Sequence, residues 1–364
     1  MIESHDFLAG PVIPITRQRA ESQFLNPDLE EDDVILNIAR DEQERIIGFI
    51  GALPGSLGSH SRFAWISGWW VDPGSGRQAA MPLFYKFLKQ WDMRVMFTDL
   101  TPKMREIFGR MNSVRIIDRQ GIRLYYRSVL TQVMVQRSPG FRKIRWLLGA
   151  IDFFANLFAG LYRIIWKLRP RITAFQIKEL TAIDESAEEF IRRTRERNSI
   201  PRGKEQIDWI IDHPWILREK GDVQKDKYPF SSSDPGFEQK LVRISEREGK
   251  GNGSGTGEGS GTGPGTAFFM VTIHRGHLKI PYLYNDNEDV LKNVAEYLNR
   301  LAVSRRVSML SSFHPGLARA LRKVRGPLLF RKKVIRYTAC SGVLYNLSEE
   351  GFVFQDGDGD AAFT

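Results

Sequence analysis

The chain has 364 residues, which is more than one compact core usually holds, so its length predicts two domains. Hydrophobic residues make up 42% of it and charged residues 26%, a globular composition that excludes wholesale disorder. A single cysteine, Cys340, excludes an internal disulfide framework and cysteine-rich zinc sites, and we expect no metal. The first residues lack the basic and apolar runs of a secretory signal, so the expected location is the cytoplasm.

The charge of the chain is positive and unevenly distributed. Lys and Arg number 53 against 43 for Asp and Glu, and the excess is concentrated in residues 94–172. Positive charge favours phosphates, nucleic acid or anionic lipid as partners without choosing among them. We recognise no helix-turn-helix, zinc finger or basic–aromatic motif, so we expect no nucleic-acid partner.

The first 140 residues show a mixed α/β pattern. A strand pair at Val34–Arg40 and Arg45–Leu53 precedes a third strand, Phe63–Val71, which is apolar throughout and therefore expected to be buried on both faces. The pattern then predicts a helix over 79–90, a strand over 95–98, a helix over 102–110, and a closing strand or hairpin over 121–135.

The strand that ends at Val71 leads through small residues at 74–76 into a helix. The free backbone N–H groups and the dipole of a helix N-terminus attract anions to one spot. Arg77, at the start of this helix, adds a planar cation suited to phosphate. This order of strand, loop and helix predicts a site for a phosphate-bearing ligand.

Residues 141–171 have the pattern of one long helix, with Pro170 near its end. Polar residues recur at spacings of three and four, which gives a narrow polar stripe beside a very wide apolar face. Three interpretations stay open: a buried helix between domains, a helix lying in a membrane interface, or a membrane span. Asp152 and Arg163 count against a span. The interfacial interpretation places these basic residues near anionic headgroups: Arg142, Lys143, Arg145, Lys167, Arg169 and Arg171.

After residue 172 a related α/β order recurs. The expected elements are helices over 183–197 and 203–212, strands around 239–245, 267–273 and 277–284, a helix over 289–304, a strand over 307–310, a helix over 316–324 and a strand over 334–345. From Gly249 to Gly265 every second residue is glycine, which predicts a flexible surface loop between two strands. The acidic residues at 356–360 are expected to lie in a solvated tail. The predicted domains are 1–140, a connecting amphipathic helix 141–172, 173–346 with the glycine-rich loop 249–265, and the tail 347–364.

Several motifs before residue 140 resemble those of the GNAT N-acetyltransferase superfamily, which binds acetyl-CoA. Val71-Asp72-Pro73 resembles the end of the family's buried strand, and Arg77 begins a stretch that resembles the loop whose amides hold the CoA pyrophosphate. Thr101–Asn112 stands where the family has its next helix, and the resemblance covers about Ile13 to Val135. Residues 15–33 and 198–215 also resemble stretches of bacterial proteins with two GNAT-like units. The resemblance implies a mixed-sheet α+β fold with two such units joined by the basic amphipathic helix.

The resemblance also implies that acetyl-CoA, or another acyl-CoA, binds along the end of the buried strand and the start of the next helix. The residues assigned to this site are Trp69, Trp70, Val71, Arg77, Gln78, Ala79, Ala80 and Met81. Three positions depart from the family pattern. Ala80 and Pro82 replace the two loop glycines, and proline removes an amide donor. Phe108 stands where the family has the tyrosine that protonates the leaving thiolate.

Acid–base groups have to come from other positions. The carboxylates available near the strands are those of Asp72, Glu44 and Asp99. Asp72 is the candidate general base, or it only caps the turn after the strand. Tyr125 and Tyr126 are candidate replacements for the missing acid, or they belong to the core.

The resemblance therefore implies an acyl-CoA-dependent N-acyltransferase of the N-acetyltransferase kind, with an amine acceptor. An amino sugar of a surface-glycan precursor is the acceptor that the two-unit resemblance suggests. The second unit has acidic residues at 285–289 in place of a pyrophosphate loop, so it is expected to shape the acceptor cleft. The alternative is a GNAT-fold protein without turnover that acts as a scaffold or membrane-surface adaptor. In either case, residues 141–171 predict peripheral contact with an anionic membrane, at its inner face.

Overall fold

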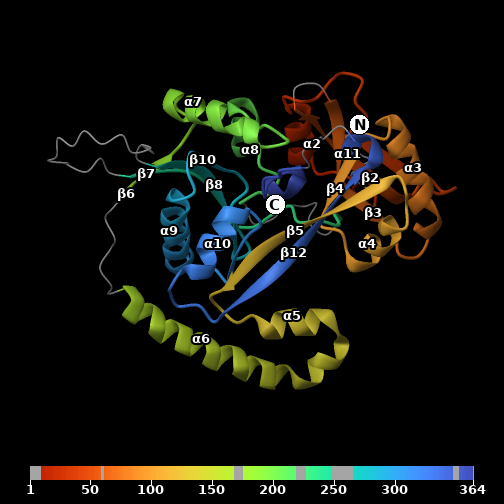
Figure 1. The fold of residues 1–364 in the computed structure, drawn as a ribbon. Coiled ribbons are helices and arrows are strands. Elements are labelled where there is room, and N and C mark those ends of the chain that lie inside the picture. The colour runs from red at the N-terminus through yellow and green to blue at the C-terminus, as the bar shows by residue number, and fades with distance from the viewer. Residues whose placement is uncertain are drawn as a thin grey trace. The chain divides into compact units, whose positions relative to one another are not determined.

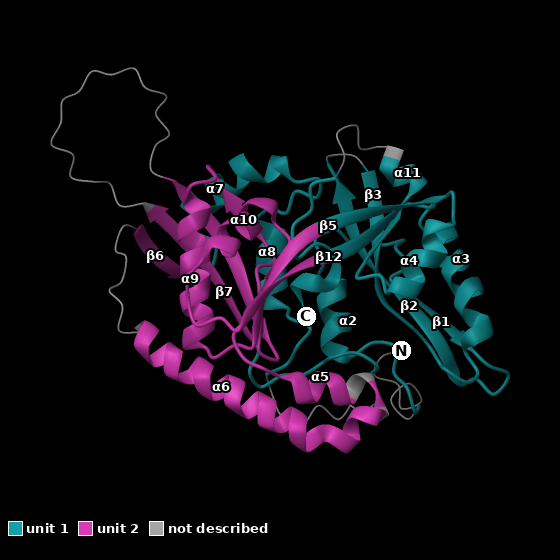
Figure 2. Ribbon diagram, turned by 60° about the horizontal axis from the view of Figure 1, so that its bottom comes forward, with its two compact units in different colours: residues 1–119, 182–237, 335–364 teal, residues 120–181, 238–334 magenta. Residues whose placement is uncertain are grey.

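In the computed structural model, the described residues are 10–58, 61–167, 175–218, 227–246, 265–346 and 352–363 (Figure 1). The chain folds into two compact units, each assembled from separate parts of the sequence (Figure 2). Unit 1 contains residues 1–119, 182–237 and 335–364, and unit 2 contains residues 120–181 and 238–334. This division differs from the consecutive domains expected from the sequence. The segment 182–237 and the C-terminal residues fold with the N-terminal ones, and the long helix belongs to unit 2.

Unit 1 is built on a mixed sheet in the order β1-β2-β3-β4-β12. Its strands are β1 (Leu36–Arg40), β2 (Ile46–Leu57), β3 (Ser61–Val71), β4 (Val95–Thr98) and the second part of β12 (Phe330–Ser341). Its helices are α2 (Arg17–Phe24), α3 (Ala80–Gln90), α4 (Pro102–Gly109), α7 (Glu185–Thr194), α8 (Lys204–Asp212) and α11 (Gly342–Asn346), with 3-10 turns η1 (Arg77–Ala79), η3 (Arg195–Arg197) and η4 (Gly359–Ala362). Aromatic residues of β4, α3 and α4 fill the core against β2 and β3.

The predicted strand pair at the start of unit 1 is confirmed. β1 and β2 run antiparallel, and the turn between them is fixed by Asp41 Oδ1, which accepts hydrogen bonds from the amides of Gln43 (3.1 Å) and Arg45 (2.9 Å). The predicted helices that became α3 and α4, and the strand Val95–Thr98, are also present. Local patterns of period two and 3.6 were sufficient here because each element buries one continuous apolar side.

The strands of unit 2 follow in the order β5-β11-β9-β8-β7-β6, with β10 beside β8. Its strands are the second part of β5 (Val114–Tyr125), β6 (Phe175–Leu180), β7 (Glu238–Glu246), β8 (Thr266–His274), β9 (His277–Lys279), β10 (Leu283–Asn285) and β11 (Met309–Ser312). Its helices are α5 (Leu130–Arg137), α6 (Arg145–Lys167), α9 (Val290–Ser304) and α10 (Pro315–Lys323), with the 3-10 turn η2 (Pro139–Ile144). β7 and β8 pair antiparallel, as expected for strands flanking the glycine-rich tract, which lies outside the described residues except for Gly265.

The predicted closing strand or hairpin over 121–135 is wrong in its second half. β5 ends at Tyr125, and residues 130–137 form α5. The carboxylate of Asp152, on α6, accepts hydrogen bonds from the amides of Leu130 (2.9 Å) and Thr131 (2.8 Å). A carboxylate on these amides satisfies the first donors of a helix, which favours helix over strand in a segment whose apolar alternation resembles a strand.

The long helix α6 is not buried, so the interpretation as a buried helix between domains is wrong. The most apolar 18-residue window within Gly140–Trp166 has a mean hydropathy of 1.4, and only 11% of it is buried, which makes the helix long and apolar enough to cross a membrane by length and composition. Its polar stripe, however, faces unit 2. Asp152 binds the start of α5, Asn156 Nδ2 donates to the Ser128 carbonyl (3.0 Å), and Arg163 Nη2 donates to the Tyr126 carbonyl (3.1 Å).

The expected solvated tail is also wrong. Most of residues 354–363 are buried within unit 1. The ring of Phe363 stacks on Trp215, with ring centroids 4.3 Å apart, and meets Trp209 edge-on at 4.9 Å. The run of alternating Asp and Gly lacks apolar residues, but the flanking Phe354 and Phe363 anchor it from both sides, and aromatic burial decides its position.

Candidate active site

β3 carries a β-bulge halfway along its length. Gly51 on β2 faces two residues of β3, Ser67 and Gly68, because the pairing register shifts there. Gly68 has a φ of 78°, a region that glycine tolerates without steric cost. A Cβ on Gly51 would lie 2.3 Å from the carbonyl oxygen of Ser67. Both glycines are therefore required for the bulge, which bends β3 away from a regular ladder.

β3 and β4 separate just before this bulge. They pair in parallel at Ala64 and Trp65, and among the described strand pairs β3 has no further partner on that side. β4 continues instead along β12, with Thr98 opposite Thr338. The two strands thus form a V, and one edge of β3 beyond Trp65 carries backbone groups outside any described ladder. Such an edge can accept an extended amide-bearing ligand by strand-like pairing.

The loop after β3 leads directly into a helix start, as the sequence predicts. The amide of Gly76 donates to the Asp72 carbonyl and that of Ala79 to the Gly76 carbonyl. Among the described hydrogen bonds, none uses the amides of Arg77 or Gln78. The Arg77 side chain is exposed and makes none of the described ion pairs. The two amides and the guanidinium together offer an anion-binding start to α3.

Asp72 holds the loop together. Its Oδ2 accepts hydrogen bonds from the amides of Gly74 (2.9 Å) and Ser75 (2.7 Å) and from the Ser75 hydroxyl (3.0 Å). The bond from the Ser75 amide contributes most to holding the pKa of Asp72 below its ordinary value. These contacts favour the capping role over the general base, because a carboxylate that accepts several hydrogen bonds is a weak proton acceptor. They also occupy two amides that a pyrophosphate would otherwise use.

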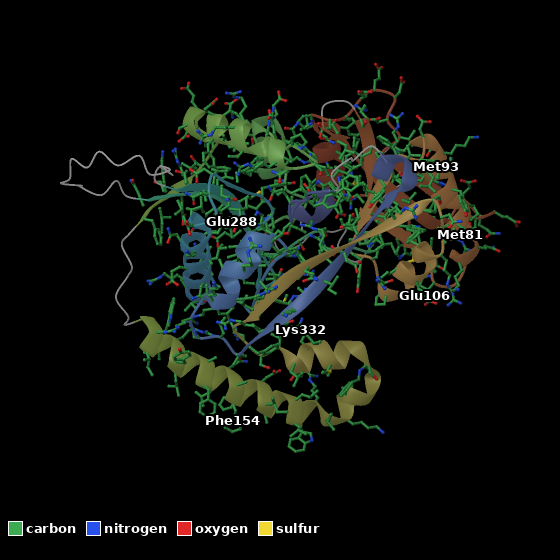
Figure 3. All side chains as sticks on the ribbon, viewed as in Figure 1. Met81, Met93, Glu106, Phe154, Glu288 and Lys332 are labelled. Atoms are coloured by element: carbon green, nitrogen blue, oxygen red, sulfur yellow. The ribbon has the colours of Figure 1, made fainter. Side chains whose placement is uncertain are left out.

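The other residues assigned to cofactor binding divide between two faces of β3. Trp69 stacks on Phe84 of α3, with centroids 5.1 Å apart, and Trp70 stacks on Phe49 of β2 at 5.6 Å. Strand alternation makes this division necessary. Val71, Ala79 and Ala80 are half-buried around the loop, while Gln78 is exposed and Met81 is 38% exposed at the start of α3 (Figure 3). Pro82 is the third residue of α3, where a missing N–H breaks no helix bond.

Polar groups from distant parts of unit 1 converge on the bulge. Arg19, on α2, donates through Nη2 to the Ser67 carbonyl (2.8 Å) and hydroxyl (2.7 Å), and through Nη1 to the Tyr228 hydroxyl. The Ser67 hydroxyl in turn donates to Asp360 Oδ2 at 2.9 Å. Arg19 and Ser67 are buried, so this network fixes the bulge from the inside.

The C-terminal segment enters the V at Gly359. A Cβ on Gly359 would lie 3.4 Å from the Trp65 ring on β3 and 3.7 Å from Thr98 Oγ1 on β4. The neighbouring Asp358 is 1% exposed, and burial raises its pKa to about 6. Its Oδ2 accepts from the Gln355 amide at 2.7 Å.

Two arginines hold this segment in place. Arg336 makes a two-point ion pair with Asp99 (2.9 and 2.8 Å) and donates through Nη1 to the Asp356 carbonyl (2.8 Å). Arg119 donates to the carbonyls of Phe354 (3.0 Å) and Gln355 (3.1 Å) and pairs with the Asp356 carboxylate. Asp99 is thus engaged in an ion pair.

The two candidate tyrosines belong to unit 2, whereas the loop belongs to unit 1. Tyr125 stacks on Phe330, with centroids 4.2 Å apart. Tyr126 is 1% exposed and donates its hydroxyl to Asn299 Oδ1 at 2.9 Å, and burial raises its pKa well above the ordinary value. Tyr126 is therefore a satisfied core residue. Phe108 packs against Phe97 at 4.6 Å in the core of unit 1.

Sequence reasoning missed Arg19, Ser67 and Asp360. Nothing local singles them out: Ser67 is a single polar residue in an apolar strand, and Asp360 lies 293 positions away from it. The one available signal was Gly68 beside Ser67, since glycine within a strand marks bulges. Cys340, expected to be an inert core thiol, is buried, and burial raises its pKa to about 12.

No protein-family model and no curated protein sequence matches the chain. Similar solved structures include a conserved protein from Enterococcus faecalis described as a probable N-acyltransferase, with 12% identity and a TM-score of 0.43 over 85% of this chain and 62% of that one. The chain thus spans less than two thirds of that protein. Saccharomyces cerevisiae N-myristoyltransferase with bound myristoyl-CoA gives 12% identity and a TM-score of 0.43 over 89% and 70%. A tandem GNAT protein from the clavulanic acid biosynthesis pathway gives 9% and 0.40 over 93% and 96%.

Proposed function

We propose that the chain is an acyl-CoA-dependent N-acyltransferase whose acyl-CoA site lies along β3 and the start of α3. One observation carries the proposal: β3 and β4 diverge at a bulge, and an edge of β3 without a partner among the described strands runs into a helix start whose amides make none of the described hydrogen bonds, beside Arg77. The amide groups of a pantetheine arm match such an edge, and a pyrophosphate matches the helix start. An amine acceptor, with an amino sugar as the first class to screen, completes the proposal.

In the proposed reaction the acceptor nitrogen bonds to the thioester carbonyl carbon, the C–S bond breaks, and the proton lost by nitrogen ends on the CoA thiol. Asp72 is engaged in its turn, and Asp99 in its ion pair. Asp360 is the carboxylate hydrogen-bonded to the bulge, so we assign the proton acceptor to Asp360 in place of Asp72.

The alternative function is a GNAT-like scaffold without turnover, and the C-terminal segment favours it. Gly359 lies between Trp65 and Thr98, within the V that the enzyme proposal leaves to the ligand. Phe108 supplies no proton. The two functions therefore differ in one measurable property, the affinity for acyl-CoA.

Isothermal titration with acetyl-CoA, and with desulfo-CoA as a thiol-free control, separates them. The enzyme proposal expects micromolar binding of both. It also expects Arg77→Ala to weaken binding by about 1–3 kcal/mol, the loss of a charge-assisted hydrogen bond. Arg110→Ala removes an exposed arginine of the same unit that directly follows α4 and pairs with Glu106; it is the matched control and should leave affinity unchanged. Absence of binding at millimolar ligand would refute the enzyme and leave the scaffold.

A further inference from the structure

The outer side of α6 carries more exposed large apolar side chains than any other described element. Its large apolar side chains are exposed over the whole length of the helix. The most exposed are Trp146 (75%), Phe158 (68%), Ile164 (63%), Phe153 (62%), Ile165 (60%) and Phe154 (56%). Figure 3 shows Phe154 on the side of α6 directed away from the body of unit 2. A helix of 23 residues extends about 35 Å, so this face is long enough to lie across many lipid headgroups.

The inner side of α6 fixes this orientation. Asp152 binds the start of α5, Asn156 binds Ser128, and Trp166 is buried in the core of unit 2. Burial tends to raise the pKa of Asp152, but the hydrogen bonds from Ser128 and residues 130–131 outweigh it and hold the pKa below its ordinary value. The outward apolar face is therefore a property of the folded unit. A membrane span would have to break every one of these contacts, which counts against that interpretation.

A pocket of about 470 Å³ opens beside this apolar face, between α6 and the end of α9. Three arginines line it, Arg127, Arg163 and Arg306, and no acidic residue does. Nε of Arg163 is buried and has no hydrogen-bond partner among the described residues. Burial, and then the charges of Arg127 and Arg306, hold the pKa of Arg163 below its ordinary value. Three guanidinium groups that repel one another call for an anion with several acceptor oxygens, such as a phosphate.

The charge of this segment also favours an anionic partner. Arg145, the first residue of α6, is exposed, as are Arg142 and Lys143 in the turn η2 that precedes it. Asp152 is the one acidic residue between 141 and 167, and it faces inward. A protein partner would need an apolar groove 35 Å long with acidic margins, whereas an anionic bilayer supplies both properties on any patch of its surface.

We propose that unit 2 docks on anionic phospholipid membranes, with the apolar face of α6 in the headgroup–acyl boundary and a lipid phosphate in the pocket of Arg127, Arg163 and Arg306. The proposal does not rest on the acyltransferase activity, because a scaffold and an enzyme would dock equally.

Vesicle flotation of the full chain tests the proposal. The vesicles are phosphatidylcholine alone, and phosphatidylcholine mixed equally with phosphatidylglycerol. The wild type should float with the mixed vesicles and much less with the neutral ones. The double variant Phe154→Ser, Phe158→Ser should bind the mixed vesicles roughly tenfold more weakly or worse, because each phenylalanine loses its transfer into lipid. Phe24→Ser, which removes a phenylalanine that is 65% exposed in unit 1, is the matched control and should bind as wild type does.

The arginine pocket needs its own variants. Arg127→Gln with Arg306→Gln should lose about fivefold in affinity for mixed vesicles for each arginine, and the preference over neutral vesicles should fall accordingly. Arg322→Gln with Lys323→Gln removes the same charge from α10 and should have a smaller effect. Equal losses in the two pairs would mean that only net charge matters, which overturns the phosphate pocket. Wild type that fails to float, or that floats regardless of Phe154 and Phe158, overturns the docking face. Sedimentation of the lipid-free chain as a dimer that the phenylalanine variant dissociates, without flotation, would assign the face to self-association instead.

Discussion

Asp358 offers a sharp test of how the C-terminal segment is held. Its carboxyl is 1% exposed, Oδ1 has no described partner, and burial raises its pKa to about 6. In the unfolded chain an aspartate titrates near 3.9. At pH values between these two pKa values, the Asp358 carboxyl is ionised in the unfolded chain but still protonated in the folded chain. Raising the pH through this range therefore destabilises the fold. The difference of two pKa units corresponds to about 3 kcal/mol between full protonation and full ionisation, of which about 2 kcal/mol is lost between pH 4 and pH 7 from this group alone.

Asp358→Asn removes this ionisation and keeps an oxygen acceptor for the Gln355 amide. Urea unfolding, followed by the fluorescence of the Trp209–Trp215 region beside Phe363, gives the stability of unit 1 at each pH. Relative to wild type, the variant should gain about 2 kcal/mol of stability between pH 4 and pH 7. If the side-chain N–H introduced by the variant finds no partner, the free energy of unfolding falls by the same amount at every pH. This shifts the plot of stability against pH without changing its slope. Asp32→Asn, at an exposed aspartate, controls for charge removal. Parallel curves for wild type and Asp358→Asn would refute the reasoning, since the carboxyl would then titrate as in water.

Three further changes test the remaining structure. Asp152→Ala should destabilise unit 2 by about 1.5–3 kcal/mol, because it leaves the start of α5 without its charged acceptor; equal urea midpoints for variant and wild type at pH 7 would contradict this. Gly51→Ala should be more damaging than Gly55→Ala in thermal unfolding, because a Cβ at Gly51 meets the Ser67 carbonyl at 2.3 Å while one at Gly55 meets only ring carbons at 3.5 Å. Asp360→Asn should lower kcat for the acyl transfer and leave acetyl-CoA affinity within about twofold, a split that a merely structural role would not produce.

The sequence predicted the local elements of both units well, and physics explains why. The pair β1–β2, the helix α3 and the pair β7–β8 each bury one apolar side that recurs with the period of the element. The loop at 72–76 was also predictable, because small residues between a buried strand and a helix have few other arrangements. The capping role of Asp72, one of two alternatives from the sequence, agrees with its three hydrogen bonds.

Long-range polar contacts could not be predicted in the same way. The convergence of Arg19, Ser67 and Asp360 joins helix α2, the middle of β3 and the C-terminal segment. Hydrogen bonds of this kind leave no periodic trace, since one serine or aspartate satisfies the geometry wherever the backbone places it. The division of the chain between the two units could not be predicted for the same reason. Residues 182–237 and the C-terminal residues belong to unit 1 because of contacts such as those of Phe363 with Trp209 and Trp215.

The helix α6 shows the same limit at a functional surface. A polar stripe beside a wide apolar face fixes which residues share a side, but not which side meets protein and which meets the surroundings. In the structure Asp152, Asn156 and Arg163 are satisfied by unit 2, so the apolar side is left outside. Each large side chain on it forgoes about 1.5–3 kcal/mol by remaining in water, and six of them together forgo about 10 kcal/mol, comparable with the whole stability of a domain. Turning the helix over would recover that energy only by stripping the polar stripe of its partners. A surface that the fold holds in this state is best explained by a medium that covers it without competing for those hydrogen bonds, which is the property of a lipid interface.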